Sequence, residues 1–293
     1  MMIDIAGNRP KFAPEEVINL LKSHYGIEAN KLHQLPSERD QNFYVQDTAE
    51  NGFVLKIAAS TEKKEILDFQ NQVIGHLQQA GRLDPAAGRC PRLCRTTSGA
   101  DILEVNGEAG DDFLLRLVTY VPGVPLAQVN PHSPQLIADI GRFLGVLDAA
   151  LLDFSHRAME RELQWDMQYA DQIISRYAAC IQDPWRRALV DDVLERFQAQ
   201  VVPHLGSLRR SVIHNDGNDH NLLISEDRKA VRRVAGIIDF GDMVYSCTVF
   251  EAAVAAAYVM LGKADPVATA AQLVGGYHEV LPFTELELEL LPT

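Results

Sequence analysis

The feature that most constrains this chain is a dense polar segment, 214–221, held between two short apolar runs. It consists of His-Asn-Asp-Gly-Asn-Asp-His-Asn, preceded by Val212-Ile213 and followed by Leu222-Leu223-Ile224. Polar, turn-forming residues between two apolar strands are typical of a functional loop on a rigid scaffold. A second acidic turn, Asp239-Phe240-Gly241-Asp242, closes the next apolar run, 234–239. The pattern predicts a loop, a hairpin and an acidic turn in close succession.

Three residues of these turns match the parts that phosphoryl transfer requires. That reaction needs a carboxylate to orient the acceptor hydroxyl and take its proton, and oxygen ligands for Mg²⁺. Asp216 precedes Asn221 by the spacing between base and metal-binding asparagine in kinase-type enzymes, and Asp239 begins an Asp-Phe-Gly tripeptide. We predict Asp216 as the base, with Asn221 and Asp239 as metal ligands. Asp242 is a candidate for a second metal or for holding the turn, and His214 for bracing the loop.

Other interpretations of the same loop stay open at this stage. Asp and Asn side chains also cap turns without any chemical role. His214, Asp216, Asp219 and His220 resemble the condensed cluster of a metal-dependent hydrolase, although a dinuclear site normally needs more histidines than this loop offers. A module that binds nucleotide without catalysis is the third alternative, and the intact set of predicted base and ligands argues against it.

The charge of the chain excludes some classes of partner. Its 293 residues include 27 Lys and Arg against 40 Asp and Glu, a formal net charge of −13. A nucleic-acid-binding protein needs a basic face, and attachment to an anionic membrane needs a basic cluster, so neither partner is expected. An acidic field suits a cationic small molecule.

The cysteines and the apolar runs bear on location. Four cysteines in a chain of this length form no disulfide framework, and the first residues contain no apolar core of a secretory signal. The longest apolar run, 249–261, contains Glu251 and is too short to span a bilayer. We expect a cytoplasmic protein with reduced thiols and no membrane partner.

The periodicity changes character near the middle of the chain. The first part alternates helical and strand patterns, whereas the second is mostly helical, and two prolines and a glycine in 120–125 mark a boundary. We predict an α+β protein with two lobes, 1–119 and 120–293. The predicted helices are 12–25, 61–80, 136–152, 165–180 and 184–200, and the predicted strands are 42–46, 52–58, 102–105, 113–118, 221–225 and 234–239.

A lysine lies inside one of the apolar strands. Lys56 follows Phe53-Val54-Leu55 and precedes Ile57. Burial of a lysine without an anionic partner is costly, so Lys56 is either on an exposed edge or a candidate to position phosphate groups. An acidic partner should lie on the next helix, where Glu65 and Asp68 share a face, and we choose Asp68.

Several segments together resemble a known family. The loop and the Asp239 turn look like those of the aminoglycoside phosphotransferase/choline kinase-like superfamily, and within it like the hydroxylysine kinases and their bacterial relatives, some of which are fused to aminotransferase domains. The resemblance implies a bilobal protein-kinase-like fold, with an antiparallel sheet and helices in the N-lobe and a mostly helical C-lobe. The supporting segments are Leu35-Pro36-Ser37, Asp40-Gln41-Asn42-Phe43, Leu115-Arg116-Leu117-Val118-Thr119-Tyr120-Val121-Pro122-Gly123, Asn218-Asp219-His220-Asn221 and Asp239-Phe240-Gly241-Asp242-Met243.

The resemblance also implies a reaction and further site residues. It implies transfer of the γ-phosphate of ATP or GTP, with Mg²⁺, to the hydroxyl of a hydroxylated amine, most of all 5-hydroxylysine, with aminoglycoside, homoserine or choline as alternative acceptors. Lys56 would position the phosphates. Ser37 and Asn42 fall in the nucleotide-covering loop, and Thr119 and Val121 in a hinge that contacts the purine.

The chain departs from the family pattern at three places. Asn215 stands where the family has Gly, and Gln70 stands where the wider superfamily has the acidic partner of the lysine. Relatives continue with further helices beyond the position of Thr293, so the resemblance leads us to expect an incomplete C-lobe. The acceptor pocket is expected near Glu160, Glu162, Trp165 and Asp166, where an aromatic ring beside acids would suit a cation.

Overall fold

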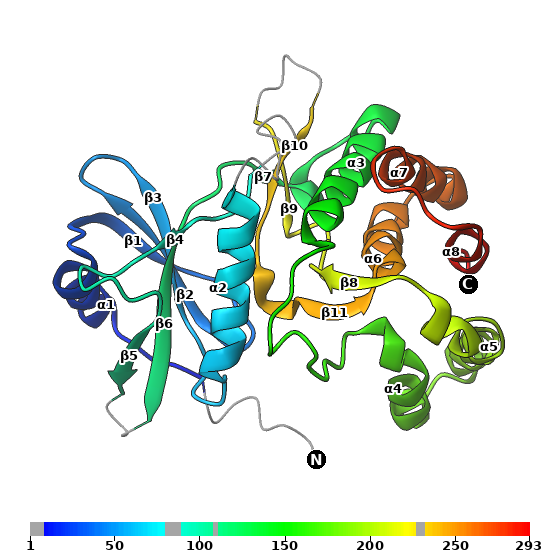
Figure 1. Cartoon of the computed structure of the whole chain (residues 1–293), viewed down its shortest axis with the longest axis horizontal. Coiled ribbons are helices and arrows are strands. Elements are labelled where there is room, and N and C mark those ends of the chain that lie inside the picture. The colour runs from blue at the N-terminus through cyan, green and yellow to red at the C-terminus, as the bar shows by residue number, and fades with distance from the viewer. Residues whose placement is uncertain (1–8, 80–88, 108–110, 227–231) are drawn as a thin grey trace. The chain divides into compact units, whose positions relative to one another are not determined.

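The computed structural model describes residues 9–79, 89–107, 111–226 and 232–293. Its internal contacts divide the chain into two compact units, drawn in Figure 1. The first comprises Met1–Ala80 and Cys90–Val121, and the second comprises Gly81–Arg89 and Pro122–Thr293. The division falls between Val121 and Pro122, in the segment where two prolines and a glycine interrupt the periodic pattern.

The first unit is built on an antiparallel sheet. Two of its hairpins, β2–β3 and β5–β6, join segments that the alternation of apolar residues predicted as strands. β5 (Leu103–Asn106) pairs with β6 beside the main path of the sheet. The strand order along that path is β1 (Ala29–Leu35), β2 (Gln41–Asp47), β3 (Gly52–Ile57), β6 (Asp112–Thr119) and β4 (Leu93–Cys94).

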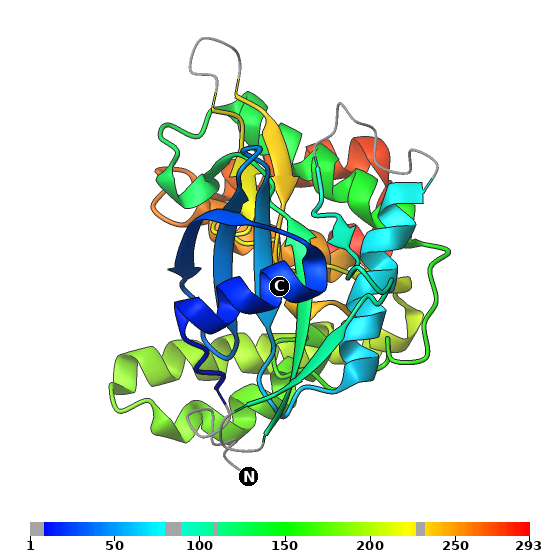
Figure 2. The ribbon, with the colours of Figure 1, turned by 90° about the vertical axis from the view of Figure 1, so that its left-hand side faces the viewer.

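One face of this sheet forms the core of the first unit. Because successive side chains of a strand point to opposite faces, Leu55 and Ile57 lie on the same face, and both are buried with Leu115 and Leu117 of β6. Helix α1 (Pro14–Leu20) and the π-helical turn that continues it, Leu21–Tyr25, close this core with Val17 and Leu21. Figure 2 shows α1 lying across that face of the sheet.

Helix α2 (Lys64–Gln78) contacts the side chains of the opposite face. Its apolar residues recur at helical spacing, and Leu67, Val73, Ile74 and Leu77 are buried. Arg116 of β6 points away from the α1 core and donates hydrogen bonds to Gln70 and Asn71 of α2. Successive residues of β6 therefore alternate between the α1 core and the side of the sheet that α2 contacts.

The second unit is mostly helical, with two short antiparallel sheets. One sheet has the strand order β10–β9–β7 and the other pairs β11 with β8. The helices are α3 (Pro134–Leu151), α4 (Ala170–Tyr177), α5 (Pro184–Gln200), α6 (Val249–Met260), α7 (Pro266–Val280) and α8 (Glu285–Leu290), and the strands are β7 (Val124–Pro125), β8 (Arg210–Ile213), β9 (Leu222–Ile224), β10 (Val234–Ile237) and β11 (Val244–Cys247).

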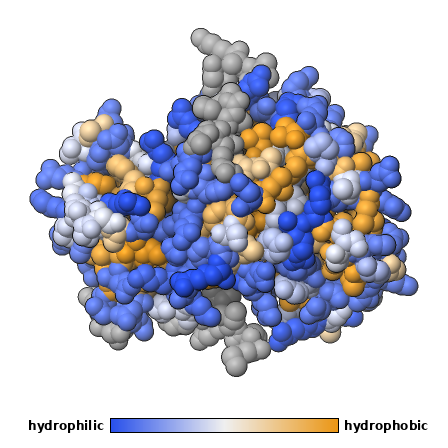
Figure 3. Space-filling view, viewed as in Figure 1, coloured by the Kyte–Doolittle hydropathy of each residue, from blue (hydrophilic) through white to orange (hydrophobic). Residues whose placement is uncertain are grey.

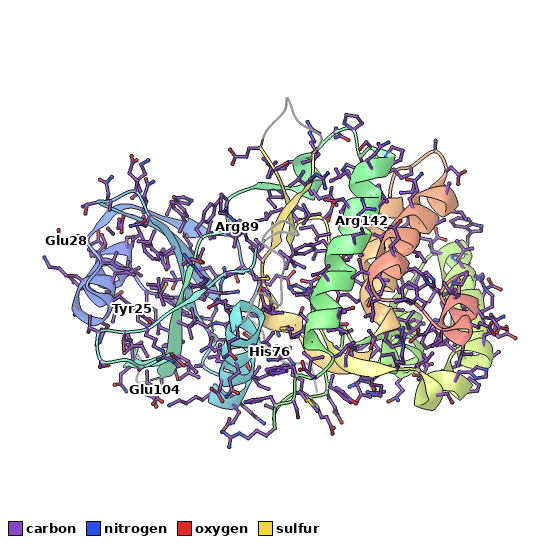
Figure 4. All side chains as sticks on the ribbon, turned by 45° about the horizontal axis from the view of Figure 1, so that its top comes forward. Tyr25, Glu28, His76, Arg89, Glu104 and Arg142 are labelled. Atoms are coloured by element: carbon purple, nitrogen blue, oxygen red, sulfur yellow. The ribbon has the colours of Figure 1, made fainter. Side chains whose placement is uncertain are left out.

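Helices α3 and α7 pack with unusually close backbones. A Cβ atom on Gly141 of α3 would lie 1.9 Å from the carbonyl oxygen of Leu273, and one on Gly276 of α7 would lie 2.1 Å from that of Ala138. At the rim of this contact Arg142, labelled in Figure 4, donates to the carboxylate of Glu279 at 3.1 Å. The two helices therefore pack backbone against backbone at these glycines.

The surface of the molecule mixes both residue types. In the face drawn in Figure 3, hydrophilic residues are interrupted by patches of hydrophobic ones on both units. Of the helices in the described residues, none combines the length and the apolar character that crossing a bilayer demands.

Candidate functional site

The polar loop begins where β8 ends and leads directly into β9. Two amide side chains of the loop hold the carboxylate of Asp216. Asn218 Nδ2 donates to Asp216 Oδ1 at 2.7 Å, and Asn221 Nδ2 donates to Asp216 Oδ2 at 2.6 Å. Asn218 Oδ1 in turn accepts from the backbone N–H groups of His220 and Asn221. The loop thus fixes the orientation of one carboxylate with its own side chains.

The surroundings of Asp216 disfavour its charged form. Burial, together with the nearby carboxylates of Asp242 and Asp239, raises the pKa of Asp216 to about 6, although the hydrogen bonds from Asn218 and Asn221 act in the opposite direction. A carboxylate with a raised pKa is a stronger proton acceptor than an ordinary aspartate while it remains mostly ionised at neutral pH.

The hairpin of β9 and β10 brings Asn221 beside the acidic turn. Leu222 of β9 pairs with Ile237 of β10, and the N–H of Ile238 donates to the carbonyl oxygen of Asn221 at 3.0 Å. Asp239 follows directly, with a left-handed φ of 62°, and accepts from the N–H of Gly241 at 3.3 Å. The two predicted metal ligands therefore stand at the ends of neighbouring strands.

The donor atoms of this pair suit Mg²⁺. Asn221 donates through Nδ2 to the backbone and side-chain oxygens of Asp216, and its side-chain carbonyl oxygen is the atom with ligand character. With the carboxylate oxygens of Asp239 this gives the hard oxygen donors that Mg²⁺ prefers. The mutual repulsion of Asp216, Asp239 and Asp242, which helps to raise the Asp216 pKa, is the electrostatic setting that a divalent cation relieves.

His214 lies in a structural position. It is fully buried, its Nε2 is 3.1 Å from the carbonyl oxygen of Ile238, and its ring meets that of Phe240 edge-on at 5.0 Å. These contacts link the polar loop to the acidic turn. They agree with the bracing role predicted for His214 rather than with a metal-ligand role, because the ring is engaged with the hairpin.

Asn215 explains a departure from the family pattern. Its backbone has a φ of 64°, in the left-handed region that favours glycine and, among other residues, tolerates asparagine best. Asn215 can therefore adopt the left-handed conformation that a glycine would also adopt at this position. The Asn215 side chain is buried.

Glu251 supports the loop from helix α6, a role that the sequence alone did not predict. Its Oε2 accepts the backbone N–H of Asn215 at 2.8 Å, and its Oε1 lies so close to Gly217 that a Cβ there would be 2.9 Å away. Burial raises the pKa of Glu251 to about 7. The only signal in the sequence was an acidic residue inside the apolar run 249–261, which we had used solely as an argument against a membrane span.

Arg161 is a second residue that sequence reasoning missed. Its Nε donates to the carbonyl oxygen of Met243 at 2.9 Å, and its Nη2 donates to that of Gly241 at 2.5 Å. The two carbonyl groups flank Asp242, so one guanidinium group holds the backbone of the acidic turn. No local pattern marks this arginine, because its partners lie 80 positions or more along the chain.

The candidate nucleotide-binding residues of the first unit lie on its sheet. Ser37 lies in the loop between β1 and β2. The sequence predicted no strand at β1, so the element expected before this loop was the first helix. Asn42 and Lys56 are directly opposite each other on β2 and β3. Asp68, the predicted partner of Lys56, accepts a hydrogen bond from Gln72 of its own helix at 3.0 Å.

The structure narrows the expected hinge contacts. The N–H of Thr119 donates to the carbonyl oxygen of Arg92 at 2.8 Å, and its hydroxyl accepts from the N–H of Arg92 at 2.9 Å. The N–H of Tyr120 donates to the carbonyl oxygen of Gly52 at 2.9 Å. The N–H and the hydroxyl of Thr119 are therefore engaged with Arg92, and contact of Thr119 and Val121 with a purine stays a prediction.

The residues expected around the acceptor divide into two kinds. Asp166 is buried and accepts from the hydroxyl of Ser246 at 2.6 Å and from the N–H of Gln168 at 3.1 Å. It therefore caps a turn and is not available to a cation. Glu160, Glu162 and Trp165 are exposed, and the indole has 62% of its surface accessible.

The histidine-based metal cluster of the alternative hydrolase is not formed. Among the described residues, no group of three or more His, Cys, Asp and Glu side chains is arranged to hold a metal ion. This absence does not concern Asn221 and Asp239, which are only two residues and supply one amide and one carboxylate.

The chain belongs to the phosphotransferase enzyme family, whose model matches residues 31–291. It is therefore a phosphotransferase, and its donor is a nucleotide. The sequence is 31% identical over 290 residues to the hydroxylysine kinase of Danio rerio, covering 97% of this chain and 80% of that protein. It is also 31% identical over 306 residues to the hydroxylysine kinase of Mus musculus, covering 98% and 79%.

Solved structures of distant relatives share the fold. The microcompartment-associated aminopropanol kinase has a TM-score of 0.74 at 17% identity, covering 94% of this chain and 84% of that one. Amicoumacin kinase hAmiN, in complex with AMP-PNP, Ca²⁺ and Ami, has a TM-score of 0.72 at 16% identity, covering 96% and 82%. The predicted α+β, kinase-like fold is thus confirmed.

Proposed function

We propose that this protein transfers the γ-phosphate of ATP or GTP to the hydroxyl group of a hydroxylated amine, with 5-hydroxylysine as the preferred acceptor. The observation that carries the proposal is the arrangement of Asp216, Asn221 and Asp239 on one loop and hairpin. The acceptor is inferred from the sequence likeness to hydroxylysine kinases. Aminoglycoside, homoserine and choline remain the competing acceptors.

Asp216 is proposed to act on the acceptor hydroxyl. The two amide donors hold both carboxylate oxygens, so the group is preorganised to accept a hydrogen bond from the hydroxyl and then its proton as the phosphoryl group transfers. Its pKa of about 6 leaves it ionised at neutral pH and suits it to proton transfer. Glu251 and Arg161 keep the loop and the turn in place.

The remaining charges of the site act on the nucleotide. Asn221 and Asp239 would hold Mg²⁺, which supplies charge neutralisation of the nucleotide phosphates when it is bound. Lys56 is proposed to position the phosphates, and the loop that contains Ser37 to cover them with its backbone N–H groups. Val121 is proposed to contact the purine through its backbone.

A turnover screen tests the proposal. Purified protein is assayed with Mg²⁺ and either ATP or GTP against 5-hydroxylysine, homoserine, choline and kanamycin, with lysine as the matched control that lacks the hydroxyl. We expect phosphorylated 5-hydroxylysine and no product from lysine. Asp216→Asn should reduce turnover by about 10²–10⁴-fold while nucleotide still raises the melting temperature.

Two outcomes of the screen would contradict the proposal. Nucleotide-dependent stabilisation without turnover of any acceptor would favour the non-catalytic module. Tightly bound Zn²⁺ in the purified protein, with hydrolytic activity and no response to nucleotide, would favour the hydrolase.

A further inference from the structure

A row of polar residues crosses the sheet of the first unit. Asn42 of β2 is directly opposite Lys56 of β3, and Lys56 is directly opposite Arg116 of β6. Residues in register on neighbouring strands share a face, so all three side chains leave the sheet on the side away from the α1 core. Arg116 lies in one of the segments that resemble the family, and the sequence alone predicts no role for it.

Arg116 is the buried anchor of this row. It is 3% exposed, and its guanidinium group donates to Asn71 Oδ1 at 3.1 Å and to Gln70 Oε1 on helix α2. An arginine keeps its charge in any protein environment, and its planar group binds two acceptors in a fixed geometry. The contact therefore ties the middle of α2 to one register position of the sheet.

The anchor restricts where the Lys56 side chain can lie. Like charges directly opposite each other on neighbouring strands repel, so the guanidinium group disfavours the Arg116 end of the row for the ammonium group. Gln70 is the residue at which the family pattern has an acid, and here its carbonyl oxygen is occupied by Arg116.

We infer that Arg116 is a positioning residue for Lys56: it fixes α2 through Gln70 and Asn71 and, by repulsion across the strands, directs the lysine toward the nucleotide phosphates. The inference rests on the proposed function, which makes Lys56 a phosphate-binding group. The contact between Arg116 and Gln70 then holds helix α2 against the sheet.

The test separates phosphate positioning from stability. The dissociation constants of ATP and adenosine, or of GTP and guanosine, are measured by calorimetry. The nucleoside constant divided by the nucleotide constant is the ratio that reports what the phosphates contribute to binding. Arg116→Met should lower that ratio by about tenfold, as loss of one charge-assisted contact does, with a much smaller change in nucleoside binding. Arg95→Met, which removes an exposed pair with Asp101, is the control and should leave the ratio unchanged.

A double-mutant cycle identifies the residue through which Arg116 acts. In a Lys56→Met background the further change Arg116→Met should leave the ratio unaltered, because the lysine that it positions is gone. An equal reduction in both backgrounds would overturn the inference, as would a lower melting temperature with an unchanged ratio. If Arg116→Met does not fold, Gln70→Ala breaks the same link from α2 and is put through the same cycle.

The proposed function can fail without this inference. A protein that binds ATP more tightly than adenosine and turns over no acceptor contradicts the proposed reaction. The same protein still reports whether the phosphate contribution depends on Arg116 and Lys56 together.

Discussion

Glu251 brings a carboxyl group into the interior of the second unit, where two other ionisable side chains are buried with it. Asp148 accepts the hydroxyl of Tyr277 at 2.5 Å, and all three residues are inaccessible to solvent. Burial, reinforced by the neighbouring Glu251, raises the pKa of Asp148 well above its usual range. The loop that carries Asp216 is therefore anchored on a residue whose ionisation is costly.

The stability of the protein should depend on the ionisation of Glu251. Its pKa is about 7 in the folded chain against an ordinary value of 4.5, so the folded state binds the proton more tightly. The free energy of unfolding therefore falls as the pH rises from about 4.5 to about 7, by up to about 1.4 kcal/mol per pH unit. We expect Glu251→Gln to flatten this slope in urea unfolding between pH 5 and 7.

A surface residue provides the control for this measurement. Glu195 is exposed on α5, and Glu195→Gln should reproduce the pH dependence of the unsubstituted protein. An unchanged slope in Glu251→Gln would show that Glu251 does not titrate in this range.

At the scale of elements, the contact between α3 and α7 depends on glycine. Gly275 and Gly276 are neighbours on α7, but a Cβ on Gly275 would meet no atom within 4 Å, whereas one on Gly276 would meet the backbone of Ala138 at 2.1 Å. Backbone cannot move aside as the end of a flexible side chain can. A larger side chain therefore has room at Gly275 and has none at Gly276, although the two residues are adjacent on α7.

The two substitutions should change stability in opposite directions. Gly275→Ala should raise the free energy of unfolding by about 0.5–1 kcal/mol, since alanine is the better helix former and has open space. Gly276→Ala should lower it by about 1–3 kcal/mol, because α3 and α7 must separate. Chemical denaturation of the two variants measures both effects, and equal effects would contradict the close approach of the helices.

The elements themselves were predictable where the periodicity was strong. Helix α5 begins and ends at the predicted residues, and the strands of the β2–β3 and β5–β6 hairpins overlap predicted strands. Strand β1 was missed because most of its side chains are polar and exposed, so its sequence shows little alternation. The predicted helix 165–180 is instead α4 flanked by 3₁₀ turns, because Asp166 caps a turn before it.

For the whole molecule, the excess of acidic residues should act on its two kinds of ligand in opposite ways. A net charge of −13 attracts a cationic acceptor and repels a nucleotide, and salt screens both effects over about 10 Å at 0.1 M. The sign of the response to salt therefore reports the charge of each ligand.

Kinetics at two ionic strengths test this. Between about 20 and 200 mM salt we expect the KM of a cationic acceptor to rise by a few fold and the KM of the nucleotide to fall. The control is an acceptor of no net charge, whose KM should stay constant. A parallel change in all three would indicate a general effect of salt on the protein.

The sequence by itself determined the α+β class, the family and the order of the polar loop, hairpin and acidic turn, because these depend on neighbours within one strand or turn. It also supplied Asp216, Asn221 and Asp239 as the candidate site. Only the tertiary structure decided what holds them, since Glu251 meets Asn215 across 36 positions and Arg116 meets Gln70 across 46. Such partners depend on which helices pack together, and periodicity reports only near neighbours.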